Sequence, residues 1–150
     1  MEIENLKQTL KANLFDFEVI HHEKPIKSRN DALCYFKLEE MAPTLILKSN
    51  KTFYALIISG GRSRVDLDKI KELLACEILQ MASKQEVLDK MNIETGRIPL
   101  VGHNLPCIID EGLFKYDFVF GGTGDFMHTL KIRPKDLERM NNTILKINLD

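Results

Sequence analysis

The sequence between residues 44 and 59 reads TLILKSNKTFYALIIS. Its two halves, TLILKS and FYALIIS, are rich in β-branched and aromatic residues, which favour strands. The polar Ser49-Asn50-Lys51 segment between them is short enough to be the turn of a hairpin. We therefore predict two antiparallel strands here, and this is the clearest β signal in the chain.

Helix signals lie on both sides of this hairpin. At the N-terminus, apolar residues recur every three or four positions, which predicts an amphipathic helix, at Ile3, Leu6, Leu10 and Leu14. A short strand is expected in FDFEVIHH (15–22), and Ser28 is a candidate N-cap for a second helix. Further along, Asp66 can cap a third helix, and Ser83 with Glu86 forms a capping box before a fourth.

The C-terminal half carries the remaining strand candidates, followed by a helix that Pro134 opens and that runs through Met140. The strand candidates are GRIPLVG (96–102), PCIID (106–110), DFVFGG (117–122) and MHTLKI (127–132). Strands in hairpins between scattered helices predict an α+β fold with a mixed, largely antiparallel sheet. We expect residues 1–150 to form one domain, since 150 residues suit one core.

Charge and hydropathy exclude several classes of protein. The formal net charge of -1 gives no overall attraction to nucleic acid, so any phosphate contact must come from a local patch of Lys and Arg. No apolar run approaches the roughly 20 residues of a membrane span, and the N-terminus lacks a signal-peptide pattern. We expect a cytoplasmic protein that binds neither membrane nor DNA.

The three cysteines, Cys34, Cys76 and Cys107, are odd in number and have no CxxC spacing, which argues against disulfides and zinc. Cys34 is expected on the apolar side of a helix and Cys107 inside a strand, both buried and unreactive. The four histidines are scattered, and neighbours such as His21 and His22 point to opposite faces of a strand. We expect no metal site.

In the GRIPLVG segment, Gly96, Pro99 and Gly102 can form a loop whose backbone approaches a ligand and presents N–H groups to an oxyanion. A tight connection between a helix and a strand is the alternative interpretation, and spacing alone leaves both open.

Seven short motifs occur in the order typical of one family, from about His22 to Met140. They are HHEKPIKS (21–28), TLILK (44–48), RVDLDKIKELL (64–74), ASKQEVLDKM (82–91), GRIPLVG (96–102), PCIIDE (106–111) and VFGG (119–122). The chain resembles the YbaK-type aminoacyl-tRNA editing family, related to the editing domain of bacterial prolyl-tRNA synthetase. The resemblance implies a barrel-like sheet with surrounding helices.

The resemblance also implies an activity: hydrolysis of the ester between a wrong amino acid and the terminal ribose of tRNA, without metal or cofactor. Alanine or cysteine on proline tRNA is the substrate that the family suggests. The implied partners are the acceptor end of mischarged tRNA and, in addition, a tRNA synthetase.

Carried over by position, Gly96 and Pro99 would form the loop that holds the ester carbonyl. The substrate-binding candidates are His22, Ser28, Thr44, Arg97, Gly102, Gly121, Gly122 and Thr129. Alternatives stay open for three of them: an N-cap for Ser28, an exposed strand-end histidine for His22 and an ordinary strand threonine for Thr129.

The chain departs from the family at Pro43, because the family's Lys-Thr-Leu is Pro43-Thr44-Leu45 here. Lys48 is expected to point away from this position, since residues five apart lie on opposite strand faces. Arg97 is a candidate to supply the missing charge, and a plain surface arginine is the alternative.

Three functions therefore remain: a deacylase, a binding module that has lost catalysis, and a structural protein with no pocket. An open pocket at the GRIPLVG loop with positive charge nearby favours the first, and a pocket alone the second. A filled cavity beside Gly96 would favour the third.

Overall fold

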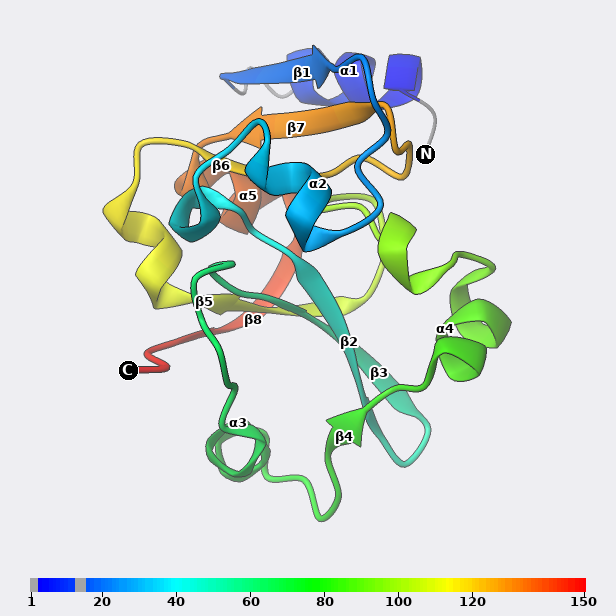
Figure 1. The fold of residues 1–150 in the computed structure, drawn as a ribbon. Coiled ribbons are helices and arrows are strands. Elements are labelled where there is room, and N and C mark those ends of the chain that lie inside the picture. Colours follow the sequence, from blue (N-terminus) through cyan, green and yellow to red (C-terminus); the bar gives the residue numbers. More distant parts are fainter. Residues whose placement is uncertain (1–2, 13–15) are drawn as a thin grey trace.

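The computed structural model describes residues 3–12 and 16–150 and places the strands in two sheets (Figure 1). One sheet has the order β1-β7-β6, with both pairings antiparallel. Its strands are β1 (Phe17–His21), β6 (Val119–Gly122) and β7 (His128–Ile132).

The other sheet has five strands in the order β4-β2-β3-β5-β8. Its strands are β2 (Thr44–Ser49), β3 (Thr52–Ile57), β4 (Gln80–Met81), β5 (Pro106–Asp110) and β8 (Asn142–Ile147). β2 is antiparallel to β3 and β4, whereas β5 runs parallel to both β3 and β8. The predicted α+β class, with mixed and largely antiparallel pairing, is confirmed, and so is the β2–β3 hairpin.

Backbone hydrogen bonds join the two sheets. Met41 forms a parallel bridge with Phe120, and the Ala42 N–H donates to the Phe120 carbonyl over 2.7 Å. The Leu100 N–H donates to the Gly122 carbonyl over 3.0 Å. As a result, β6 at the edge of the smaller sheet is hydrogen-bonded to the segment before β2 and to the segment before β5.

Five α-helices and three 3₁₀ turns connect the described strands. The α-helices are α1 (Ile3–Ala12), α2 (Arg29–Leu33), α3 (Leu67–Leu74), α4 (Lys84–Met91) and α5 (Pro134–Met140). The 3₁₀ turns are η1 (Leu38–Glu40), η2 (Thr95–Arg97) and η3 (Glu111–Lys115). The predicted caps are confirmed: Ser28 and Asp66 each accept an N–H from the first turn, and Ser83 and Glu86 form the reciprocal capping box.

Several expectations at the level of single elements are wrong. GRIPLVG is not a strand: η2 and an irregular loop occupy it. β4 and β8 had not been predicted. Cys34 is exposed, because α2 ends at Leu33, whereas Cys107 is buried as expected and burial raises the pKa of its thiol to about 12. Leu14, assigned to the first helix, lies outside the described residues.

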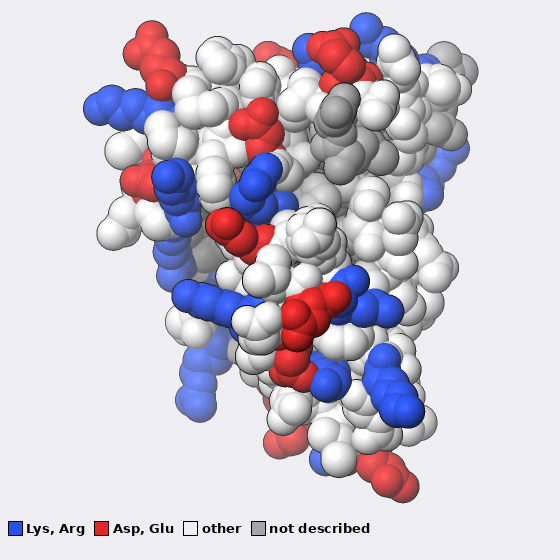
Figure 2. Space-filling model, turned by 90° about the vertical axis from the view of Figure 1, so that its right-hand side faces the viewer, with Lys and Arg blue, Asp and Glu red and all other residues white. Residues whose placement is uncertain are grey.

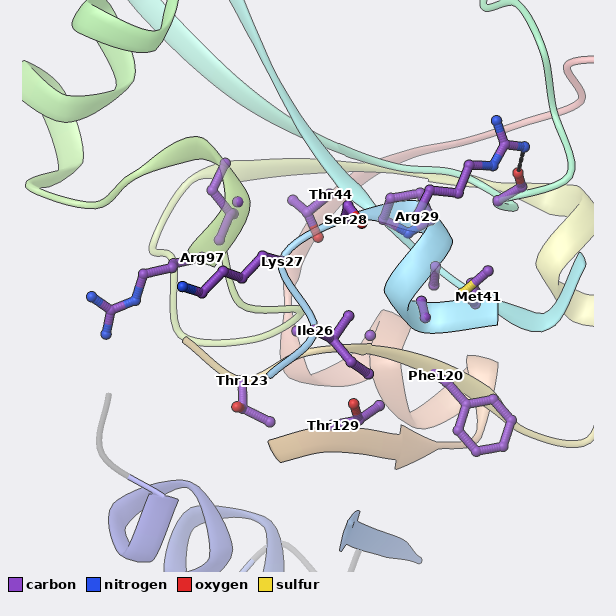
Figure 3. A pocket seen from close by; sticks show the side chains of 18 of the residues that line it. Ile26, Lys27, Ser28, Arg29, Met41, Thr44, Arg97, Phe120, Thr123 and Thr129 are labelled. Atoms are coloured by element: carbon purple, nitrogen blue, oxygen red, sulfur yellow. Dashed lines mark hydrogen bonds between the residues drawn. The ribbon is translucent and has the colours of Figure 1, made fainter. Parts of the chain in front are cut away.

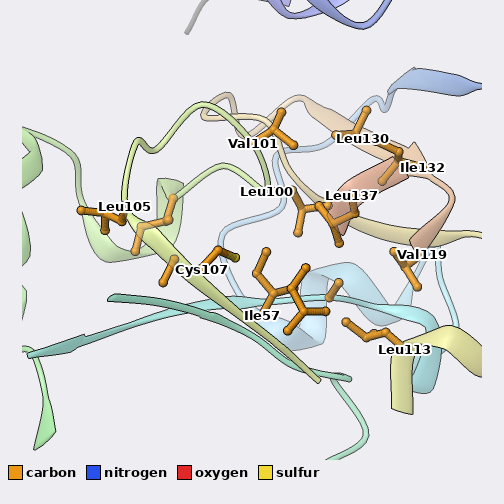
Figure 4. Packing of buried hydrophobic residues seen from close by; sticks show 14 of the residues in the cluster. Ile57, Leu100, Val101, Leu105, Cys107, Leu113, Val119, Leu130, Ile132 and Leu137 are labelled. Atoms are coloured by element: carbon orange, nitrogen blue, oxygen red, sulfur yellow. The ribbon is translucent and has the colours of Figure 1, made fainter. Parts of the chain in front are cut away.

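Strand β5 of the five-stranded sheet is buried on both faces. Ile109 belongs to the main core between the two sheets, which Figure 4 shows, while its neighbour Ile108 packs in a second cluster with Leu56 and Ile70 of α3. All four side chains are fully buried, and the alternation along β5 follows the period of a strand. The main core holds the two sheets at a fixed separation, on which the shape of any cavity at their junction depends.

His103 generates a prediction about pH. The Leu105 N–H donates to its Nδ1 over 3.2 Å, which requires a neutral ring, and burial lowers the pKa of His103 from 6.5 to about 4. The unfolded chain therefore takes up a proton between these pH values while the folded chain does not. We expect the free energy of unfolding to fall by about 3 kcal/mol as the pH drops from 6.5 to 4.

Urea unfolding of wild type and His103→Asn at both pH values measures this effect. Asparagine keeps an acceptor for the Leu105 N–H but does not titrate, so its stability should show a smaller pH dependence. An equal pH dependence in the two proteins would contradict the assignment to His103.

Candidate functional site

A cavity of about 430 Å³ opens where the two sheets meet. Four stretches of the chain form its wall (Figure 3). They are residues 26–45, from the segment before α2 to the start of β2; residues 58–62, after β3; the η2 loop (95–98); and residues 120–129, from β6 into β7. These segments lie far apart in the sequence and are brought together by the junction between the sheets. The size suits a small organic group rather than a metal ion.

The mouth of the cavity is cationic. The Arg97 Nε–H donates to the Gly124 carbonyl over 3.0 Å, and the Arg97 guanidinium carbon lies 5.5 Å from the centre of the Phe126 ring. The Lys27 ammonium lies 5.6 Å from the same ring. Within residues 3–12 and 16–150, neither cation forms a salt bridge, so both charges remain available to an anionic ligand.

Asp125 is the acid among the residues that line this cavity. The backbone N–H of Met127, together with His128 and the charge of Arg97, holds the pKa of its carboxyl below the usual value despite partial burial. Asp125 is therefore ionised at neutral pH and is not poised to act as a general acid.

The opposite end of the cavity is apolar. Phe36 and Phe120 stack with their ring centres 4.7 Å apart, and Met41 lies beside them. Figure 3 shows Met41 and Phe120 on the side of the cavity away from Arg97 and Lys27. A ligand with one charged and one apolar part is thus the kind that the cavity can orient.

Thr44 contributes an unused polar group to the wall. Its hydroxyl oxygen is buried and has no hydrogen-bond partner among the described residues. An unpaired buried hydroxyl costs folding free energy, and this one is available to a polar group that enters the cavity.

Arg62 also reaches the cavity wall, but its charge is neutralised. Its Nε and Nη2 donate to the two carboxylate oxygens of Asp110, which is fully buried, and its Nη1 donates to Asp150 over 2.9 Å. Burial alone would raise the pKa of Asp110, but the hydrogen bonds from Arg62 and from the Ser59 and Gly112 amides outweigh it and lower that pKa. Arg62 therefore shapes the cavity without offering it a free cation.

Two glycines of β6 let the η2 loop pack directly against the strand. A Cβ at Gly122 would lie 2.6 Å from the Ile98 carbonyl oxygen, and one at Gly121 would lie 2.4 Å from the Leu100 side chain. Both distances are shorter than any real contact, so only glycine allows this approach. The loop that carries Gly96 is consequently held at a fixed depth beside the cavity.

Seven of the ten sequence-predicted site residues line the cavity: Gly96, Ser28, Thr44, Arg97, Gly121, Gly122 and Thr129. Ser28 is at the same time the N-cap of α2. Lys48 does not line the cavity, as predicted, and pairs instead with Glu86 at 2.5 Å.

Three predicted residues lie away from the cavity wall. Pro99 is buried beneath it between Ile98 and Leu100, and Gly102 takes a φ of 85° in the turn that leaves the loop. His22 is only 4% exposed, so the interpretation as an exposed strand-end histidine is wrong, and its side chain is not part of the cavity wall. Its Nδ1–H donates to the Lys24 carbonyl. Its Nε2 lies 3.2 Å from the hydroxyl of Thr129 and orients that hydroxyl by a hydrogen bond.

Lys27 and Phe126 were missed by sequence reasoning. Phe126 follows the GGTG segment, and no motif distinguishes it from a turn residue. Lys27 sits inside the HHEKPIKS motif next to Ser28, and its position there was the only signal that could have found it.

No trio of His, Cys, Asp or Glu side chains in the described part of the chain is arranged to hold a metal ion. Nor is any helix in that part long and apolar enough to cross a membrane. The fold and the cavity together define a small α+β protein with a cavity at the junction of two sheets, cationic at its mouth and lined by apolar side chains at its opposite end.

Comparison with known proteins identifies the family of this protein. Residues 24–140 match the aminoacyl-tRNA editing domain family, so the chain belongs to that family. The proline--tRNA ligase of Thermosipho africanus (strain TCF52B) is 27% identical over 97 residues, which span 63% of this chain and 17% of the ligase. The proline--tRNA ligase of Chlamydia muridarum is 30% identical over 77 residues, or 49% of this chain and 13% of that enzyme. The chain thus corresponds to less than a fifth of these relatives.

Solved structures agree on the fold. APE2540 superposes with a TM-score of 0.82 at 24% identity, covering 94% of this chain and 96% of that one. A protein described as a candidate trans-editing enzyme for prolyl tRNA synthetase superposes with a TM-score of 0.80 at 24% identity, covering 98% and 95%. At this identity the likeness confirms the YbaK-like fold, including the arrangement of both sheets.

The contact between loop and β6 generates a stability prediction. Gly122→Ala should destabilise the protein by about 1 to 3 kcal/mol, because the Ile98 carbonyl is backbone and cannot rotate away. Gly96→Ala is the matched control, since its Cβ would meet Phe126 at 3.8 Å and the Lys27 carbonyl at 3.9 Å, which are ordinary contacts. Chemical denaturation compares the two, and equal stabilities would contradict the close approach at Gly122.

Proposed function

We propose that this protein is a trans-acting aminoacyl-tRNA deacylase, which hydrolyses the ester of mischarged tRNA. The observation that carries the proposal is the open cavity beside Gly96 with Lys27 and Arg97 at its mouth. An aminoacylated tRNA end presents phosphate and ribose on one side of an ester and an amino acid on the other. The cationic mouth suits the first part and the apolar end suits the second.

Backbone groups supply the chemistry in this proposal. Gly96 is the second residue of η2, and the first N–H groups of a helical turn have no carbonyl partner within that turn. In this proposal the Gly96 N–H donates to the oxyanion that forms at the ester carbonyl. Water attacks the carbonyl carbon and the bond to the ribose oxygen breaks. That oxygen receives the proton that the water gives up, either directly or by relay through the neighbouring ribose hydroxyl, which passes on its own proton and takes the one from water. The products are a free amino acid and an uncharged tRNA.

Arg97 replaces the lysine that the family has at Pro43. It lies on the cavity wall, its guanidinium has free N–H groups beyond the one bonded to Gly124, and its fork suits phosphate oxygens. Thr129 and Thr44 add hydroxyls along the same wall, the first oriented by His22.

The substrate that we propose is alanine or cysteine on proline tRNA, met in the cytoplasm by way of its acceptor end, with a tRNA synthetase as a further partner. The loss of the family lysine favours a second candidate, a module that binds the acceptor end or an aminoacyl ligand without hydrolysing it. The cationic mouth argues for the enzyme over this module. The open cavity argues against a purely structural role.

Release of amino acid from a panel of mischarged tRNAs, including Ala and Cys on proline tRNA, tests the activity. We expect turnover above the buffer rate. Gly96→Pro, which lacks the amide hydrogen, should reduce kcat about 100-fold or more, and Gly96→Ala, which keeps it, should reduce kcat less. No release from any substrate by folded protein would contradict the deacylase and support the binding module.

Removal of the unpaired hydroxyl should separate stability from activity. Thr44→Val keeps the shape of the side chain, so we expect the free energy of unfolding to stay the same or to rise by up to about 1 kcal/mol. In contrast, kcat/KM for the best substrate of the panel should fall about fivefold or more, because the ligand loses a partner. A variant that loses stability while its kcat/KM is unchanged would show that the hydroxyl serves the fold and not the ligand.

A further inference from the structure

A second cavity, of about 540 Å³, adjoins the first at Gly96. We call it the α4 groove, and its lining residues are Lys27, Lys84, Gln85, Leu88, Glu94, Thr95, Gly96 and Phe126. Lys27, Thr95, Gly96 and Phe126 belong to both cavities. A ligand whose ester lies at Gly96 can therefore continue past the Phe126 ring towards α4 without leaving the protein surface.

Phe126 has the surroundings of a stacking platform for a nucleic-acid base. The ring is partly exposed, and Lys27 and Arg97 lie 5.6 and 5.5 Å from its centre. Sites for single-stranded nucleic acid combine such aromatic faces, on which bases stack, with cations that contact the phosphates. Leu88, which is 41% exposed, adds apolar surface to the same groove.

The charge of the groove favours an anion. Lys27 and Lys84 are exposed lining residues, Arg97 lies at the shared rim, and none of the three forms a salt bridge in the part of the chain that the structure describes. Glu94 is the acid among the lining residues, and its side chain does not cap η2. Figure 2 shows this side of the molecule, where Lys and Arg side chains spread across the surface among acidic ones. The positive charge is thus local, as a chain of net charge -1 requires.

We propose that the α4 groove binds the unpaired nucleotides that precede the aminoacylated ribose of tRNA, with a base on Phe126 and phosphates at Lys27, Lys84 and Arg97. The identity of this ligand rests on the proposed function. The groove then sets how the ester enters the first cavity, and it makes affinity depend on a single-stranded RNA end rather than on the amino acid.

Fluorescence anisotropy with two RNAs tests the groove. One is an acceptor-stem hairpin with a four-nucleotide ACCA overhang, and the other is the same hairpin with the overhang removed. We expect Phe126→Leu to weaken binding of the first RNA about fivefold or more through lost stacking, while Phe126→Tyr binds like wild type. Lys84→Ala should also weaken it and lower the slope of log affinity against log salt by about 1.

Two further variants sharpen the comparison. Glu94→Gln should tighten binding of the hairpin with the overhang, because it removes the negative charge from the groove. Lys115→Ala, on η3 and outside both cavities, should leave the affinity for both RNAs unchanged. Binding of the trimmed hairpin should be the same for all variants.

The proposal would be overturned if the groove variants bind RNA as tightly as Lys115→Ala does, or if they lose affinity equally for both RNAs. Phe126→Tyr and a denaturation curve for each variant separate loss of stacking from loss of folding. The assay needs no hydrolysis, so its outcome is distinct from that of the deacylase. If no mischarged tRNA is hydrolysed but the overhang effect is present, the groove stands and the activity fails. If mischarged tRNA is hydrolysed but the overhang has no effect on binding, the deacylase activity stands and the proposal for the groove is wrong.

Discussion

The close contact between the η2 loop and β6 is the constraint on which the site depends. Gly121 and Gly122 leave no side chain on β6 where Ile98 and Leu100 approach, and the Leu100 N–H bonds to the Gly122 carbonyl. This contact sets the position of Gly96, which separates the cavity from the α4 groove. A site that relies on a backbone amide needs such a fixed loop, because a backbone donor has no rotamer with which to adjust.

Charged groups around the cavity are paired where they are buried and unpaired where water reaches them. The buried carboxylate of Asp110 binds Arg62, so that pair is internally neutral. Lys27, Arg29 and Arg97 line the cavity without a salt bridge in the described part of the chain, and Arg29 donates to the Gly60 carbonyl. Lys27 and Arg97 lie at the mouth, where water still solvates them and little desolvation energy is lost. The side chains of Phe36, Met41 and Phe120, which form the apolar end, carry no charge. A ligand with both kinds of group is therefore expected to bind with its anionic part at the mouth and its apolar part at the inner end of the cavity.

Features with local causes could be predicted from the sequence. The β2–β3 hairpin, the Ser28 and Asp66 caps and the Ser83–Glu86 box each depend on residues within a few positions of one another. Seven of the residues that line the cavity could be predicted as well, because the order of motifs resembles a family. β8 was missed since its pattern, exposed on one face, follows α5 directly and gains its place only by pairing in parallel with β5.

Features with distant causes could not be predicted. His22 is buried because Tyr35 of the chain after α2 lies 5.3 Å from its ring and Thr129 of β7 meets its Nε2. Phe126 becomes a platform only where the segments around Lys27 and Arg97 converge on it, and those residues are 70 positions apart. Neither arrangement leaves a periodic or spaced signal in the chain.

In the proposed complex, the ester of an aminoacylated RNA end lies at Gly96. Nuclear magnetic resonance with an amide-linked aminoacyl-adenosine, which cannot be hydrolysed as an ester, tests this placement most directly. We predict saturable shifts of the Gly96 amide and of the Thr44 and Thr129 resonances, with those of η3 unchanged. Saturable binding that leaves the Gly96 amide unshifted would contradict it.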